Sequence, residues 1–193
     1  MAAPRILAGS AKGRRLRTPP RGTRPSPARL RAALFDSLAF SPRGRFLDLY
    51  AGSGAVGLEA ASRGWETLLV ERSPQATGLL RDNARTCGLR VQVLRGDALQ
   101  LAARLAGDVD VVFADPPFDH DLPSIFQALI DLEMVRPGGR YAFQHPSGLS
   151  LDLRRDDAAL PTDTRRYGSN ALSFVPARPG SGIHASAPAG LVP

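Results

Sequence analysis

The chain has 193 residues, of which 43% are hydrophobic and 22% charged, and its formal net charge is +7. These values are typical of a globular protein with one compact domain, and no apolar run reaches the roughly 18 residues that a membrane span needs. A single cysteine, Cys87, excludes a disulfide framework and a thiolate metal cluster. That cysteine content fits a reducing cytoplasm, and because the first ten residues lack a signal-peptide core, we expect a mature N-terminus.

Basic residues are concentrated at the N-terminus. Residues 1–45 contain ten Arg and Lys12 but only one acid, Asp36, a net charge of +10, whereas the remaining residues sum to −3. Genome base composition can explain Arg over Lys, but it does not explain the clustering. Such a basic block predicts a polyanionic partner, usually nucleic acid. We therefore expect a basic arm over 1–45, a body over 46–175 and a disordered tail, rich in Pro, Gly, Ala and Ser, over 176–193.

Two short elements are predicted within the arm. The segment 5–19 resembles two short strands in a hairpin, which we expect to be separate from the glycine loop. Ser26 is suited to cap a helix, the proline after it suits the first turn, and leucines recur every four residues. This pattern predicts an amphipathic helix over 27–39, with Arg29 and Arg31 outside its apolar stripe.

The body alternates short apolar runs with longer helical segments. Continuous apolar character is typical of parallel strands buried on both faces. The predicted strands are 46–50, 67–71, 91–95, 109–115 and 140–144. The predicted helices lie near 56–63, 74–87, 98–105 and 122–133. This order predicts an α/β fold, a Rossmann-like doubly wound and mostly parallel sheet, in which ligands bind beyond the carboxyl ends of the strands.

A glycine loop follows the first predicted strand. Gly52, Gly54 and Gly57 form a G-x-G-x-x-G motif, whose missing side chains let the backbone approach a ligand at a helix N-terminus. Glu71 ends the second strand, where an acid can accept hydrogen bonds from ribose hydroxyls of NAD or of S-adenosylmethionine (SAM). Asp48, just before the loop, favours SAM, because a carboxylate attracts its ammonium and sulfonium groups but repels a pyrophosphate.

Three of these acids also have a structural interpretation. Asp48 is suited to cap the loop, and Glu71 is suited to pair with Arg72 on the surface. Asp97, after the third strand, fits two roles equally well, as a partner of an adenine amino group and as the N-cap of the next helix.

The fourth strand ends in the motif Asp115-Pro116-Pro117-Phe118. Two prolines remove two backbone donors and fix the loop, which leaves the Pro116 carbonyl available to accept a hydrogen bond. A carboxylate, a rigid carbonyl and an aromatic ring together suit an exocyclic amino group on a nucleobase. Asp115 and Pro116 accept its two N–H bonds while Phe118 stacks on the base. The structural alternative is a strand end that is simply terminated by prolines.

Over roughly residues 4–175 the chain resembles the RsmD-type bacterial small-subunit (16S) rRNA guanine-N2 methyltransferases. The resemblance rests on RILAGSAKGRRLRTPP, TRPSPARLRAALF, FLDLYAGSGAVGLEAASRG, VER, GDAL, DPPF and RRYGSNALSFV, in that order. It implies methyl transfer from SAM to the N2 amine of a guanine in small-subunit rRNA, and the small ribosomal subunit as partner. The arm is then expected to meet rRNA.

The residues expected in each role follow from the motifs and this resemblance together. The expected cofactor-binding residues are Asp48, Tyr50, Gly52, Ser53, Gly54, Glu71, Arg72, Asp97 and Ala98. The residues expected to hold the target base and serve catalysis are Asp115, Pro116, Pro117 and Phe118. The expected RNA-binding residues are Arg14, Arg15, Arg17, Arg24 and Arg29, of which the last two either contact RNA or close over the methionine end of SAM.

Two positions depart from the family pattern. Ala32 and Gln144 stand where the family usually has Glu, so an acid is lost at each. His145 is a possible base, although a lone loop histidine is more often solvated. His120 and His184 lack partners at metal-ligand spacing, and we expect no metal.

Three other functions remain open. The Asp115 motif suits the N6 amine of adenine in DNA or in another RNA equally well. A SAM-binding or RNA-binding assembly factor without catalysis is a second possibility, against which the intact motif argues. An NAD oxidoreductase is disfavoured by Asp48. We expect a cytoplasmic monomer without membrane contact.

Overall fold

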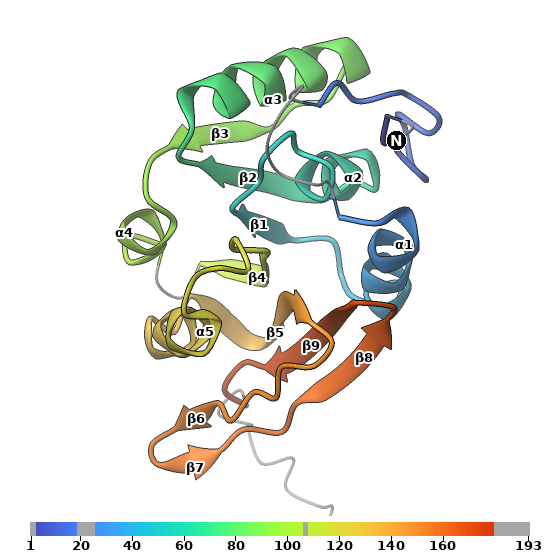
Figure 1. Ribbon diagram of the computed structural model, residues 1–193. Coiled ribbons are helices and arrows are strands. Elements are labelled where there is room, and N and C mark those ends of the chain that lie inside the picture. The colour runs from blue at the N-terminus through green and yellow to red at the C-terminus, as the bar shows by residue number, and fades with distance from the viewer. Residues whose placement is uncertain (1–2, 19–25, 106–107, 180–193) are drawn as a thin grey trace, which may run out of the picture.

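The computed structural model describes residues 3–18, 26–105 and 108–179, and within these a seven-stranded sheet has the order β3-β2-β1-β4-β5-β9-β8 (Figure 1). Strands β1 to β5 are parallel to one another, whereas β9 runs antiparallel to β5 and β8. The strands are β1 (Arg45–Leu49), β2 (Glu66–Glu71), β3 (Gln92–Arg95), β4 (Val109–Ala114), β5 (Val135–Pro146), β8 (Asp163–Tyr167) and β9 (Asn170–Pro176). The predicted Rossmann-like sheet is confirmed, and its strand order reverses beside β1, where ligands bind in such sheets.

Helices cover both faces of the sheet (Figure 1). They are α1 (Ala28–Ser37), α2 (Gly57–Ser62), α3 (Pro74–Cys87), α4 (Ala98–Ala102) and α5 (Leu122–Asp131). Apolar residues of α4 and α5 pack on one face, and those of α1, α2 and α3 pack on the other. A small hairpin of β6 (Arg154–Arg155) and β7 (Ala158–Ala159) lies outside the main sheet. In the part of the chain that is described, no helix is long and apolar enough to cross a membrane.

The arm does form a tight turn, but it packs on the body. Its strand pairing is one antiparallel bridge, between Arg5 and Arg15, rather than two strands. Ile6 and Leu16 are each 1% exposed and join the same apolar cluster as α2 and α3. The Asn83 side chain accepts from the Arg17 amide and donates to its carbonyl, each at 2.9 Å. The expectation that this segment is separate from the glycine loop was therefore wrong, because its apolar residues share a cluster with Ala51 and Ala55 of that loop.

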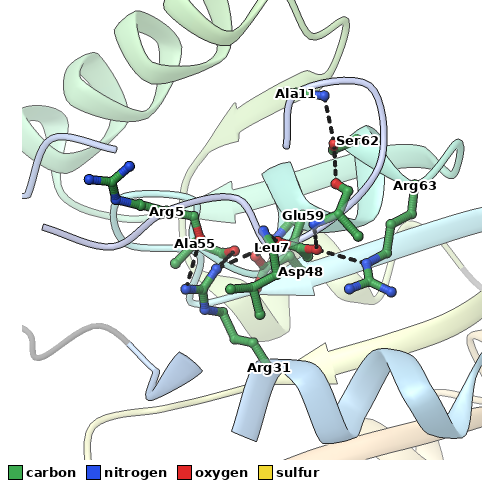
Figure 2. A network of polar contacts seen from close by, with 11 residues as sticks. Arg5, Leu7, Ala11, Arg31, Asp48, Ala55, Glu59, Ser62 and Arg63 are labelled. Carbon is green, nitrogen blue, oxygen red and sulfur yellow. Dashed lines mark hydrogen bonds and ion pairs between the residues drawn. The ribbon is translucent and has the colours of Figure 1, made fainter. Parts of the chain in front are cut away.

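Helix α1 is anchored by a buried arginine. Arg31 is 1% exposed, so placing it outside the apolar stripe was wrong. Its guanidinium donates to the carbonyls of Ala55 (3.2 Å) and Arg5 (3.1 Å), and it pairs with Glu59 at 3.7 Å (Figure 2). Glu59, itself fully buried, also accepts from the Leu7 amide and from Arg63. This polar network ties the arm, α1, α2 and the glycine loop together.

Ser26 does not cap α1. Pro27 occupies the N-cap position without a side-chain hydrogen bond, and the Ser26 hydroxyl instead donates to Asp115. The helix ends at Ser37, two residues earlier than predicted. Of the expected tail, residues 180–193 lie outside the described residues.

Candidate functional site

A cavity of about 1000 Å³ lies at the carboxyl ends of β1, β2, β4 and β5. It brings together all the residues expected to bind cofactor or target base except Gly54. One end is formed by the glycine loop and by the residues that follow β2 and β3. The other is formed by the Asp115 motif and by residues of β5 and the β8–β9 turn. Apart from Gly54, the residues expected at the strand ends thus lie around one cavity, which has room for two ligand groups.

Asp48 lies on the floor of this cavity and is 1% exposed. Its Oδ2 accepts from the Gly57 amide at 2.7 Å, so the loop-capping interpretation is correct in part. Burial raises the pKa of Asp48 well above its usual value, the Gly57 hydrogen bond opposes this, and the nearby charges of Asp115 and Glu71 raise it further. Among the described residues no cation pairs with Asp48, so a positively charged ligand group would stabilise its ionised form.

Glu71 holds the glycine loop in place. Its Oε2 accepts from the Gly52 amide at 2.8 Å and its Oε1 accepts from the Ser73 amide at 2.7 Å. In the described part of the chain it makes no ion pair with Arg72, so the surface-pair interpretation was wrong. Each carboxylate oxygen retains a second acceptor position. Glu71 can therefore orient the loop and still accept from ligand hydroxyls.

Tyr50 adopts a left-handed backbone with φ of 65°, which is unusual for a residue with a side chain. It lies between the end of β1 and the glycine loop and lines the cavity. Burial raises the pKa of its phenol to about 12, and the charge of Asp97 adds to that increase. Strained backbone of this kind is concentrated at ligand sites, which is consistent with the predicted role of Tyr50.

Gly54 is required for packing of the glycine loop against α3. It does not line the cavity, its φ is +87°, and an added Cβ would lie 2.2 Å from Leu80 Cδ1. The glycine therefore lets the loop pass close to α3.

Asp97 has one of its two predicted roles and keeps an oxygen free for the other. Its Oδ1 accepts from the Gln100 amide at 3.1 Å, so it is the N-cap of α4. It also lines the cavity beside Ala98, and in the described part of the chain nothing donates to its Oδ2. One oxygen thus serves the helix while the other is available to a ligand.

The Asp115 motif forms the other end of the cavity. Asp115 Oδ2 accepts the Ser26 hydroxyl at 2.9 Å. Burial raises the pKa of Asp115 to about 7, and the Ser26 hydrogen bond acts in the opposite direction. Pro116 is buried, and nothing in the described residues donates to its carbonyl oxygen. Phe118 is 44% exposed, so its ring is available for stacking. Two acceptors and an aromatic ring are therefore free at one point of the cavity.

Three further observations concern residues near this end. Ser26 and Gln144 line the cavity, although the sequence predicted Ser26 as a helix cap and marked Gln144 only as a departure from a family pattern.

His145 is neither solvated nor in the cavity. It is fully buried, with ring nitrogens 2.9 Å from the Pro146 carbonyl and 2.8 Å from the Ser173 hydroxyl. In the described ranges no group of three or more His, Cys, Asp or Glu is arranged to hold a metal ion.

The arginines expected to meet RNA differ from those of the body. Arg14, Arg15, Arg17 and Arg29 are exposed, and within the described residues none of them is ion-paired. Arg24 lies outside the described residues. Paired arginines in the body include Arg85, Arg136, Arg154, Arg165 and Arg178. These four arginines of the arm are thus exposed and without acidic partners, as Arg81, Arg90 and Arg95 of the body also are within the described residues, whereas Arg31 and Arg45 of the arm are ion-paired.

A family model described as "Conserved hypothetical protein 95" matches residues 4–176. The chain is 30% identical over 183 residues to YlbH of Bacillus subtilis, which is named as a candidate rRNA methyltransferase, and the match covers 90% of this chain and 99% of that protein. It is 35% identical over 122 residues to the ribosomal RNA small subunit methyltransferase D of Escherichia coli, covering 61% of this chain and 62% of that protein.

A solved structure of the hypothetical protein TTHA0928 from Thermus thermophilus is also similar. It has 45% sequence identity and a TM-score of 0.81, and the match covers 89% of this chain and 98% of that one. The similarity therefore includes both the arm and the sheet.

Proposed function

The chain belongs to the family described as "Conserved hypothetical protein 95", the RsmD family, and on that basis we propose that it methylates the exocyclic N2 amine of a guanine in small-subunit rRNA, with SAM as the methyl donor. The observation that carries this proposal is that one cavity holds two features. One is a buried carboxylate without a cation, and the other is a set of two free hydrogen-bond acceptors beside an aromatic ring. Asp48 is the carboxylate, and Asp115 and Pro116 provide the acceptors.

The cofactor end fits SAM. Asp48 attracts the positively charged methionine end, since its ionised form accepts from the Gly57 amide but pairs with no cation among the described residues. Glu71 and Asp97 each keep acceptor positions for ribose hydroxyls and an adenine amino group. When bound, SAM supplies an electrophilic methyl group on a sulfonium. Tyr50, Gly52, Ser53, Arg72 and Ala98 complete the wall around it.

The target end holds an amino group by its hydrogens. Asp115 Oδ1 and the Pro116 carbonyl accept the two N–H bonds of the amine while Phe118 stacks on the base. An amine held in this way has its lone pair less delocalised into the ring, so it is a better nucleophile. The amine gains the methyl group as the bond from that methyl to the sulfonium breaks, which leaves a thioether, and the amine loses one proton. Asp115 takes that proton because it already accepts one of the N–H bonds. Most of the rate enhancement then comes from positioning.

The arm supplies the RNA contact. The exposed arginines of the arm are suited to bind phosphates, because no ion pair within the described residues has to break first and binding only releases counterions. They are Arg14, Arg15, Arg17 and Arg29. Arg24, whose structure is not described, belongs to the same group by sequence. We further propose that the protein acts as a monomer in the cytoplasm, where ribosomal subunits are made, and that it needs no metal.

The test is transfer of a labelled methyl group from SAM to four substrates, followed by nucleoside analysis. The substrates are naked small-subunit rRNA, assembled small subunits, large subunits and DNA. We expect N2-methylguanosine in the small-subunit RNA and its loss in an Asp115→Ala variant. N6-methyladenosine would favour the adenine alternative, which the Asp115 motif also suits, and no labelled nucleoside at all would overturn the proposal.

A further inference from the structure

Gln144 carries an unpaired polar atom at the target end of the cavity. The residue lies near the end of β5, is 3% exposed and lines the cavity. Its Oε1 is buried, and within the described residues no donor reaches it. A buried acceptor without a donor costs stability, and such groups are rare in folded proteins. This atom is therefore suited to a ligand donor.

The sheet places Gln144 beside Asp115. The parallel register of β4 and β5 ends with Ala114 opposite Phe143, so the next residues, Asp115 and Gln144, follow side by side on neighbouring strands. Neighbouring strands are about 4.8 Å apart, and side chains alternate between the two faces. Both side chains therefore reach the same face, and both line the same cavity.

The residues around Gln144 fix its backbone. Phe143 stacks on Phe126 with ring centroids 4.4 Å apart, and the His145 ring contacts the Pro146 carbonyl and the Ser173 hydroxyl. Since both flanking side chains are packed on the opposite face, the Gln144 side chain leaves the sheet on the side of the cavity. A side chain held on one face of a sheet discriminates between ligands better than one on a mobile loop.

We propose that Gln144 reads the Watson–Crick edge of the target guanine, its Oε1 accepting the N1–H that lies next to the N2 amine. This inference rests on the proposed function. Guanine presents donors at both N1 and N2, which match Oε1 and the Asp115 carboxylate. Adenine has an acceptor at N1, so its N1 and Oε1 would be two acceptors facing each other, and they would repel. Gln144 thereby selects guanine over adenine at an amine-binding motif that serves either base.

The experiment compares Gln144→Met, Gln144→Leu and Gln144→Glu with wild type on assembled small subunits. We expect the Met and Leu variants to lose about tenfold or more in kcat/KM, because one base-reading hydrogen bond is removed. The Glu variant retains more activity, because its oxygens still accept N1–H. The affinity for S-adenosylhomocysteine, measured by calorimetry, should stay unchanged in all three.

Thermal melting separates this role from a structural one. Met and Leu remove an unpaired buried acceptor, so their melting temperatures should equal or exceed that of wild type. Gln92→Met is the matched control, since Gln92 is exposed on β3, and it should change neither quantity. Full activity in the Met and Leu variants, or equal loss in the Glu variant, would overturn the inference. An inactive wild-type protein would instead overturn the proposed function.

Discussion

The Ser26 hydroxyl donates to Asp115 Oδ2 at 2.9 Å and so connects the start of α1 to a strand end 89 positions later in the chain. Burial raises the pKa of Asp115 to about 7, and this hydrogen bond favours the ionised carboxylate. The ionised form is the one that accepts the amine hydrogens. Ser26 is therefore a positioning residue that keeps Asp115 oriented and charged.

The pH dependence of methyl transfer tests this role of Ser26. In wild type, kcat should rise with pH through a midpoint near 7, because Asp115 must be ionised. Ser26→Ala removes the hydrogen bond that lowers the pKa, so its midpoint should lie at higher pH. Ser26→Thr retains a hydroxyl and should behave like wild type. Identical pH profiles for the Ala and Thr variants would show that Ser26 does not act on Asp115.

Asp115→Asn should stabilise the protein in a pH-dependent way. The folded pKa of Asp115, about 7, lies above the ordinary value of 3.8, so the folded state binds its proton more tightly than the unfolded state does. Stability from this group is complete below pH 4 and is lost as the pH rises to about 7. Asn cannot ionise, so the gain in melting temperature over wild type should grow from pH 4 to pH 7 and then level off.

The measurement is thermal melting of both proteins across that range, with methyl transfer as a second readout. Activity of Asp115→Asn should fall at least about a hundredfold, as for loss of one well-placed polar group in a reacting site. The affinity for SAM should change far less. A gain in melting temperature that does not depend on pH would contradict the assigned pKa shift.

The sheet and most helices were predictable because their signals are local. Strands buried on both faces have continuous apolar runs, and these located β1 to β4 to within a residue or two. Helix α3 was predicted with its observed bounds, Pro74–Cys87, where Ser73 caps the start and Gly88 ends it in a left-handed conformation. The cavity followed from a general rule, that parallel sheets bind ligands at the carboxyl ends of their strands.

The remaining features depend on partners that are distant in the sequence. Arginine is usually exposed, so the sequence did not indicate that Arg31 is buried. Its contacts with Glu59 and with carbonyls of the arm and the glycine loop explain its burial. Ser26 precedes a helix, as a capping residue does, but its hydroxyl donates to Asp115 instead. For the same reason, a glycine motif could not show that the loop packs against Leu80 of α3 at Gly54.

Substitution of two glycines should separate steric clash from backbone strain. Gly54 and Gly64 have similar positive φ values, +87° and +90°, but an added Cβ clashes with Leu80 at Gly54 and meets open space at Gly64. Gly64→Ala should therefore cost about 1 kcal/mol in the free energy of unfolding, from strain alone. Gly54→Ala should cost about 2–4 kcal/mol, because overpacking adds to that strain. Urea denaturation measures both, and equal losses would contradict the packing role of Gly54.

The arm arginines should carry the salt dependence of RNA binding. Each phosphate contact contributes about 0.7–0.9 to the slope of log affinity against log salt concentration. Arg14, Arg15 and Arg17 are exposed and, within the described residues, without ion pairs, so changing all three to Ala should reduce the slope by about 2–3. Their backbone contacts remain in such a variant, since Asn83 bonds the main chain of Arg17, and SAM affinity should stay nearly unchanged.

A second triple variant of equal charge change is the matched control. Arg85, Arg136 and Arg154 pair with acids of the body, so their replacement by Ala should leave the slope nearly unchanged although the net charge falls by the same amount. Filter binding to small-subunit rRNA at several salt concentrations compares the three proteins. Equal slopes in the two triple variants would mean that net charge alone sets RNA affinity. A reduced slope only in the control would move the RNA surface from the arm to the body, because counterion release reports where the phosphates bind.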